Sequence, residues 1–136
     1  AGGGGIPVRA DAQGNLVGVE AVVDKAYTAG LLAHEIGADT IVFVSSRERI
    51  AGALHQRGIE NGMPVRMALP ALSMLIEQRR DIEEGVRNML VASQQFLRRG
   101  GKSVLVVPPD RIHTDLDAYC GVYLYAQPVE YQTEGS

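Results

Sequence analysis

Two continuous apolar segments constrain the fold of this 136-residue chain more than any other feature. They are Thr40–Val44 and Ser103–Val107, both rich in β-branched residues, and a segment with helical spacing of apolar residues precedes each. Strands that are apolar on both faces are typical of a parallel sheet that is covered by helices. We therefore predict that the sheet core contains residues 41–44 and 104–107, with neighbouring strands parallel.

The spacing of apolar residues elsewhere predicts helices. The expected helical segments are residues 22–36, 47–57, 70–78, 82–99 and 113–119. Gly37 is expected to end the first of them, and Asp81 is expected to cap the long helix that Gly100 ends. The buried stripe of the long helix is predicted to consist of Ile82, Val86, Met89, Leu90, Phe96 and Leu97.

Shorter elements complete the predicted fold. A turn cluster at residues 11–15 separates two short apolar stretches and predicts a hairpin, whereas residues 63–67 are ambiguous. Residues 121–127 predict a final strand with Tyr123 and Tyr125 on one face. Strands that alternate with helices indicate an α/β fold in which a mostly parallel sheet is layered with helices.

Composition and charge restrict the class of protein. A hydrophobic content of 46% fits one domain with a buried core over residues 1–128, followed by a polar tail over residues 129–136. The net charge of -3 argues against binding to nucleic acid or to an anionic membrane, because either would favour a basic patch. Cys120 is the only cysteine, and the sequence contains no apolar segment of membrane-spanning length and no signal-peptide pattern. We therefore expect a soluble protein of the cytoplasm.

The first candidate site is the glycine run formed by Gly2, Gly3, Gly4 and Gly5. Glycines let the backbone approach an anion closely and direct several N–H groups at it. The alternative is a flexible linker without a function. A glycine-rich turn usually follows a strand that positions it, and no such strand precedes this one. We therefore expect a fragment, or a half that pairs with another chain.

The second candidate site is the dipeptide Asp24-Lys25, which opens the first predicted helix within the segment GVEAVVDK. A lysine at a helix N-terminus can hold a phosphate, aided by the helix dipole, while a neighbouring aspartate fixes the lysine. A solvated ion pair in the first helical turn is the alternative for the same two residues. The three histidines lack acidic or cysteine partners at ligand spacing, so no metal-binding residue is predicted.

The sequence resembles the amino-acid kinase family, and most closely carbamate kinase, in the order and spacing of five segments. These segments are GGGGIPV, a short polar hairpin, GVEAVVDK, a helix and GADTIVFV. The match is best over residues 1–44, and the resemblance implies the nucleotide-binding, C-terminal half of that fold. It implies that the glycine loop lies against the acyl-phosphate end of the substrate. It also implies that Asp24 organises the active-site lysines and that Lys25 contacts the transferred phosphoryl group. The implied reaction is ATP-dependent phosphoryl transfer to or from a carbamate or carboxylate, with Mg²⁺ bridging the phosphates.

The sequence also departs from the family pattern. Ser45-Ser46 follow the first apolar strand where family members carry a threonine-aspartate pair. No lysine follows Met74, although the family has a Gly-Met-x-x-Lys segment whose lysine reaches the nucleotide phosphates. These departures favour a second hypothesis, a non-catalytic subunit that binds a nucleotide or oxyanion or is purely structural. The intact glycine and Asp24-Lys25 motifs favour the enzyme.

The expected partners are a nucleotide and a small carboxylate or carbamate. We also expect a homo-oligomer, or a partner chain that supplies the missing N-terminal half of the family fold. Tyrosines are enriched at protein contacts, and four of them gather in the C-terminal region, at Tyr119, Tyr123, Tyr125 and Tyr131. A third hypothesis is a binding module that assembles through this tyrosine-rich edge and uses no nucleotide.

Overall fold

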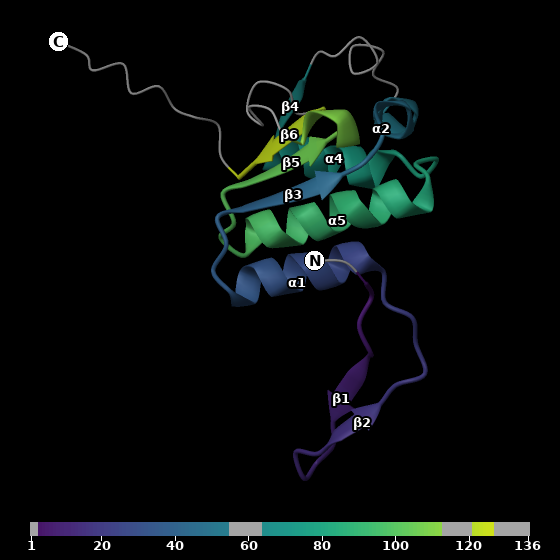
Figure 1. Cartoon of the computed structure of the whole chain (residues 1–136), viewed down its shortest axis with the longest axis vertical. Coiled ribbons are helices and arrows are strands. Elements are labelled where there is room, and N and C mark those ends of the chain that lie inside the picture. The colour runs from purple at the N-terminus through teal and green to yellow at the C-terminus, as the bar shows by residue number, and fades with distance from the viewer. Residues whose placement is uncertain (1–2, 55–63, 113–120, 127–136) are drawn as a thin grey trace, which may run out of the picture.

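The computed structural model describes residues 3–54, 64–112 and 121–126 (Figure 1). Several predicted features lie wholly or partly outside these ranges: Gly2, residues 55–57 of the second predicted helix, residue 63, the short helix at residues 113–119, residue 127 of the final strand, Tyr131 and the rest of the tail at residues 129–136. Within the described ranges, no helix has the length and apolar character needed to cross a membrane.

The described part of the chain forms strands and helices in alternation. The strands are β1 (Val8–Ala10), β2 (Leu16–Gly18), β3 (Thr40–Val44), β4 (Val65–Ala68), β5 (Ser103–Val107) and β6 (Val122–Tyr125). The helices are α1 (Lys25–Glu35), α2 (Arg47–Leu54), α4 (Leu69–Gln78), α5 (Glu84–Arg98) and the short 3₁₀-helix η1 (Pro109–Arg111). The predicted hairpin is β1–β2, and the ambiguous segment at residues 63–67 contributes to β4. The α/β class is therefore confirmed.

The main sheet has four strands in the order β3-β5-β6-β4, and β1 and β2 form a separate hairpin. β3 pairs with β5 in parallel, as predicted, and β4 pairs with β6 in parallel. β5 and β6 are antiparallel, so the prediction of parallel neighbours is wrong for this pair. Val122 at the start of β6 lies opposite Val106 near the end of β5. The chain therefore turns back at that end of the sheet instead of crossing to the other end.

Helix α5 organises the core. In Figure 1, α1, α4 and α5 lie on one side of the sheet, and α5 contacts β5 as well as the other two helices. All six residues of the predicted stripe are buried, among them Phe96 and Leu90 with 2% exposure each. The cap of α5 is Glu83 and not Asp81 as predicted. The Glu83 carboxylate accepts a hydrogen bond from the Gly85 N–H (3.0 Å), whereas Asp81 pairs with Arg79.

Helix α1 packs against α5 through small residues. Ala26, Gly30 and Ala33 form its buried face. A Cβ atom at Gly30 would lie 3.5 Å from the Ala92 carbonyl oxygen of α5, so the two backbones approach closely. Leu31 and Leu32 of α1 are 52% and 44% exposed, and Ile36, the C-cap of the helix, is 69% exposed.

Strand β3 is an edge strand, and this position changes its predicted burial. Ile41 is buried and Phe43 packs against the core, because these two residues face the helices. Val42 and Val44, on the other face, are 39% and 51% exposed. The prediction of burial on both faces is therefore wrong for β3 and correct for β5, which lies between two strands and is buried along its whole length.

Strand β6, which carries Tyr123 and Tyr125, lies inside the sheet between β5 and β4, whereas Tyr119 and Tyr131 lie outside the described residues. Tyr123 and Tyr125 share one face, as predicted, with ring centroids 5.8 Å apart. The guanidinium of Arg66 on β4 lies 5.1 Å from the centre of the Tyr123 ring. The open edge of the sheet nearest α1, which carries Lys25, is β3.

Candidate functional site

The Asp24-Lys25 dipeptide opens α1, as the sequence predicts. Asp24 is the N-cap, with extended backbone and a carboxylate oxygen that accepts a hydrogen bond from the Ala26 N–H (2.8 Å). Lys25 is the first helical residue and is exposed, and the described part of the chain provides no ion-pair partner for it. Asp24 therefore fixes the start of the helix from which Lys25 projects, rather than forming an ion pair with the lysine.

The glycine run lies against the same end of α1. The Gly4 carbonyl oxygen accepts a hydrogen bond from the Thr28 hydroxyl (2.9 Å), which ties the loop to the helix. A Cβ atom at Gly4 would collide with the carbonyl oxygen of Val23, so only glycine allows this close approach. Gly3 and Gly5 have positive φ angles of 113° and 71°, a conformation that favours glycine.

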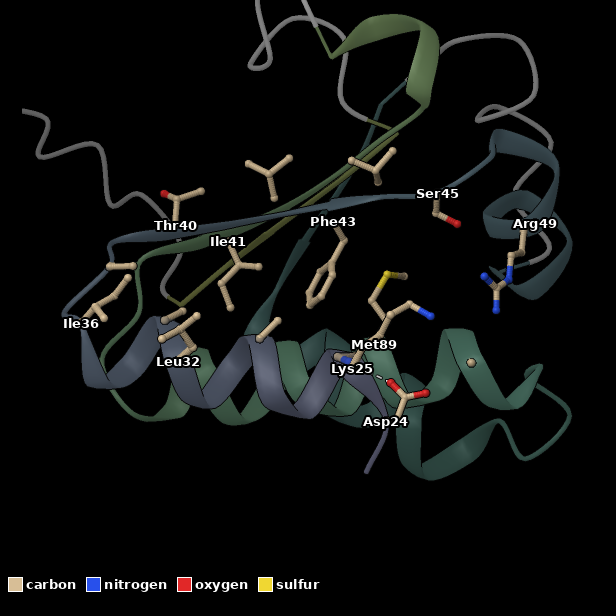
Figure 2. A pocket seen from close by; sticks show the side chains of 17 residues that line it. Asp24, Lys25, Leu32, Ile36, Thr40, Ile41, Phe43, Ser45, Arg49 and Met89 are labelled. Carbon is tan, nitrogen blue, oxygen red and sulfur yellow. Dashed lines mark hydrogen bonds between the residues drawn. The ribbon is translucent and has the colours of Figure 1, made fainter. Parts of the chain in front are cut away.

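A cavity of about 520 Å³ lies between α1, β3 and the first turns of α5 (Figure 2). Polar side chains gather at one end of it: Asp24, Lys25, Ser45 and Arg49. Its apolar walls include Leu32, Ile36, Ile41, Phe43 and Met89. Figure 2 shows Ile36 at the end away from Lys25 and Arg49. The described glycines of the run, at residues 3–5, do not line the cavity.

The polar end of the cavity lies where ligands bind in many α/β proteins. Ser45 directly follows the carboxyl end of β3, and its N–H donates a hydrogen bond to the Val107 carbonyl at the end of β5 (3.1 Å). Open α/β sheets bind ligands outside the carboxyl ends of their strands. The position of Lys25 and Arg49 at this edge therefore suits an anionic group, with an apolar portion along the walls.

Arg49 projects from α2 and forms an ion pair with Glu83. Its Nε lies 2.8 Å from Glu83 Oε2 and its Nη2 lies 2.9 Å from Oε1, a bidentate geometry. These hydrogen bonds lower the pKa of Glu83 to about 2 and raise the pKa of Arg49 above its ordinary value. Both groups are therefore charged at neutral pH. Asp24 also contributes to the raised pKa of Arg49, through the attraction between opposite charges.

Sequence reasoning found one part of this site and missed another. It placed Asp24 and Lys25 at a helix start, but it treated the segment at residues 47–57 only as a helix and did not single out Arg49. The available signal was the position of Arg49, which is five residues after the end of β3. Within the described residues, no group of three or more histidine, cysteine, aspartate or glutamate side chains is arranged to hold a metal ion.

No protein-family model matches the sequence. The carbamate kinase-like protein YahI of Escherichia coli K12 is 32% identical over 130 residues, which are 91% of this chain and 39% of that protein. Carbamate kinase of Trichomonas vaginalis is 33% identical over 111 residues, which are 80% of this chain and 34% of that protein. The chain thus spans between a third and two fifths of the length of these curated relatives.

Solved structures agree on the fold. Carbamate kinase from Giardia lamblia bound to AMP-PNP superposes on this chain with a TM-score of 0.70 and 19% identity. The match covers 91% of this chain and 42% of the Giardia chain. The same enzyme thiocarbamoylated by disulfiram gives a TM-score of 0.70 with 20% identity, over 91% of this chain and 37% of the Giardia chain. The resemblance that the sequence motifs indicated is therefore confirmed. The chain is a homologue of carbamate kinases over most of its own length.

Proposed function

We propose that the chain is the nucleotide-side part of a carbamate-kinase-like phosphotransferase. The reaction is ATP-dependent phosphoryl transfer to or from a carbamate or carboxylate. An acceptor oxygen forms a bond to the γ-phosphorus, the bond from that phosphorus to the β,γ-bridging oxygen breaks, and ADP leaves with the electron pair. The observation that supports this proposal most is the position of Lys25 at the polar end of the cavity. Lys25 has no ion-pair partner in the described part of the chain, and the chain is a homologue of carbamate kinases.

The residues of the site have distinct parts in this proposal. Lys25 stabilises the negative charge of the transferred phosphoryl group, because a cation placed near that group offsets the charge. Asp24 holds the start of α1 and thereby the position of Lys25. In this proposal the glycine run, Gly2 to Gly5, contacts the acyl-phosphate end of the substrate through backbone N–H groups, and its described glycines, residues 3–5, lie outside the lining of the cavity itself.

The proposed reaction also uses Mg²⁺, which binds to the nucleotide phosphates. Mg²⁺ in such sites binds to phosphates, to water and to one or two protein carboxylates. Asp24 is the carboxylate among the described residues that line the cavity. The residues present therefore fit a phosphate-bound Mg²⁺ ion, and they do not form a complete protein cage for it.

A non-catalytic subunit that binds a nucleotide or an oxyanion, or has a structural role, is the second candidate. The observation that favours it is the segment after Met74, where the resemblance leads us to expect a lysine and the chain has Glu77 and Gln78 instead. Phosphoryl transfer depends on several positioned charges, so the loss of one cation lowers the rate more than the affinity.

Two measurements on the same protein separate these candidates. Isothermal titration with ATP–Mg²⁺ and with ADP measures nucleotide binding. Formation of ATP from ADP and carbamoyl phosphate measures phosphoryl transfer. The proposal expects binding together with transfer, and binding without transfer would favour the non-catalytic subunit. If neither nucleotide binds at millimolar concentration, both nucleotide hypotheses are contradicted.

We also propose that a second polypeptide segment covers the side of the molecule near β3. This segment belongs to a second copy or to a partner that supplies the part of the relatives that the chain does not span. The support is the exposed edge strand with Val42 and Val44, together with the exposed Ile36 at the C-cap of α1. An apolar edge strand is prone to pair with another chain.

Sedimentation velocity tests self-association through this edge. We expect species heavier than the 14.6 kDa monomer, and we expect Val44→Lys to shift the population toward the monomer, because a charge on the open edge opposes pairing. A wild-type chain that stays monomeric over a wide concentration range would count against a homo-oligomer.

A further inference from the structure

Arg49 lies at the polar end of the cavity, and neither the sequence motifs nor the family resemblance assigns it a role. It comes from α2, whereas Lys25 comes from α1, so two separate elements bring a cation to the same cavity. Figure 2 shows the Arg49 and Lys25 side chains near Ser45, at the end of β3.

The first turn of α5 holds Arg49 in place. Glu83, the N-cap of α5, accepts hydrogen bonds from both Arg49 and the Gly85 N–H. A Cβ atom at Gly85 would collide with Arg49 Nη2, so the missing side chain at this position leaves room for the guanidinium. Gly85 also lines the cavity, which places the guanidinium at the cavity wall.

The ion pair of Arg49 and Glu83 is accessible and exchangeable. The two side chains are 51% and 53% exposed. Exposed ion pairs contribute little net stability, since both charges remain well solvated when they separate. A phosphate presents more negative charge than a carboxylate, and its oxygens match the guanidinium fork equally well. A phosphate-bearing ligand can therefore replace Glu83 as the partner of Arg49 at small cost.

We propose that Arg49 is a second anion-binding residue of this cavity, and that it exchanges the Glu83 carboxylate for the phosphate oxygens of the ligand. Glu83 retains its hydrogen bond from Gly85 and remains the cap of α5 after the exchange. Lys25 and Arg49 then hold the phosphates from two sides. The identity of the ligand as a nucleotide rests on the function proposed above, whereas the anion site itself requires only a di- or triphosphate group.

Titration of Arg49 variants with ADP and with pyrophosphate tests this inference. Arg49→Gln is expected to weaken binding of both probes about ten- to a hundredfold, because it removes a charge-assisted contact. Arg49→Lys retains the positive charge but not the two-donor geometry of the guanidinium, so it is expected to show a smaller loss of affinity. Glu83→Gln removes the competing carboxylate and is expected to tighten binding about two- to fivefold.

Arg79→Gln is the matched control. Arg79 also forms a bidentate pair with an acidic residue, at 2.7 and 2.9 Å from the oxygens of Asp81, but it does not line the cavity. This variant is expected to bind both probes like the wild type. Circular dichroism of each variant reports whether the fold is retained, and the Arg49→Lys and Glu83→Gln results remain informative if Arg49→Gln unfolds.

The outcomes separate this inference from the proposed function. If ADP binds in a Lys25-dependent manner and Arg49→Gln has no effect, the inference is wrong and the function stands. If pyrophosphate binding depends on Arg49 but ADP binds no tighter than pyrophosphate, the anion site stands and the nucleotide assignment fails. If Glu83→Gln leaves affinity unchanged or lowers it, the exchange is contradicted. If neither probe binds to the wild type, both proposals fall.

Discussion

Replacing Lys25 with methionine is expected to lower the affinity for ATP, ADP and acyl phosphates about ten- to a hundredfold. Methionine keeps most of the side-chain stem and removes the charge, so one charge-assisted contact is lost, worth roughly 1.5–3 kcal/mol. Folding is expected to change little, because Lys25 is exposed and has no ion-pair partner within the described residues. Isothermal titration of the variant and the wild type gives the two affinities directly.

Lys102→Met is the control for this substitution. Lys102, the other lysine of the chain, precedes β5 at the amino end of the strand and pairs with Asp39 at 3.0 Å. It does not line the cavity. Equal affinities of wild type, Lys25→Met and Lys102→Met would show that the Asp24-Lys25 motif is only a helix start in this chain.

Phe96→Ala is expected to give the largest loss of stability. Phe96 is 2% exposed near the C-terminal end of α5, and its ring packs against Gly101, where a Cβ atom would collide with it. Truncation of a buried phenylalanine leaves a cavity and costs about 3–5 kcal/mol in the free energy of unfolding. Urea denaturation followed by circular dichroism measures this change as a lower midpoint.

Gln95→Ala on the same helix is the matched control. Gln95 is exposed, so its truncation is expected to change the free energy of unfolding by no more than about 0.5 kcal/mol. If Phe96→Ala unfolds at the same urea concentration as Gln95→Ala, the assignment of α5 as the centre of the core is wrong.

Long periodic or uniformly apolar segments were the most predictable parts of the fold. The stripe of α5 and the burial of β5 follow from local patterns, because those patterns reflect contacts on every side of the element. β3 has the same apolar character as β5, yet its Val42 and Val44 are exposed. The difference comes from the position of β3 at the sheet edge, and strand order is not encoded in the local sequence.

Directions and caps were harder to predict for a similar reason. The antiparallel pairing of β6 depends on which end of the sheet the chain returns to after η1. Asp81 and Glu83 are both plausible caps in sequence, and the choice was decided by the pairing of Asp81 with Arg79. Such competition between nearby partners depends on geometry that periodicity does not report.

The candidate site also has one part that local sequence predicts and one part that depends on tertiary contacts. Asp24 and Lys25 could be located because a motif with a physical mechanism lies at a predicted helix start. Arg49 enters the site only because α2 folds back beside the first turn of α5, and Gly85 leaves room for its guanidinium. A contact between residues 49 and 83 joins distant parts of the sequence, so no local pattern predicted it.

The central claim is that phosphates bind at Lys25, and the lysine content of the chain allows a direct test. Lys25 and Lys102 are its only lysines, so selective ¹³C labelling of lysine gives one side-chain signal from each in an NMR spectrum. Addition of ATP–Mg²⁺ or ADP is expected to shift the Lys25 signal in a saturable manner and to leave the Lys102 signal in place. If neither signal moves, or if both move together without saturation, the phosphate site at the start of α1 does not exist.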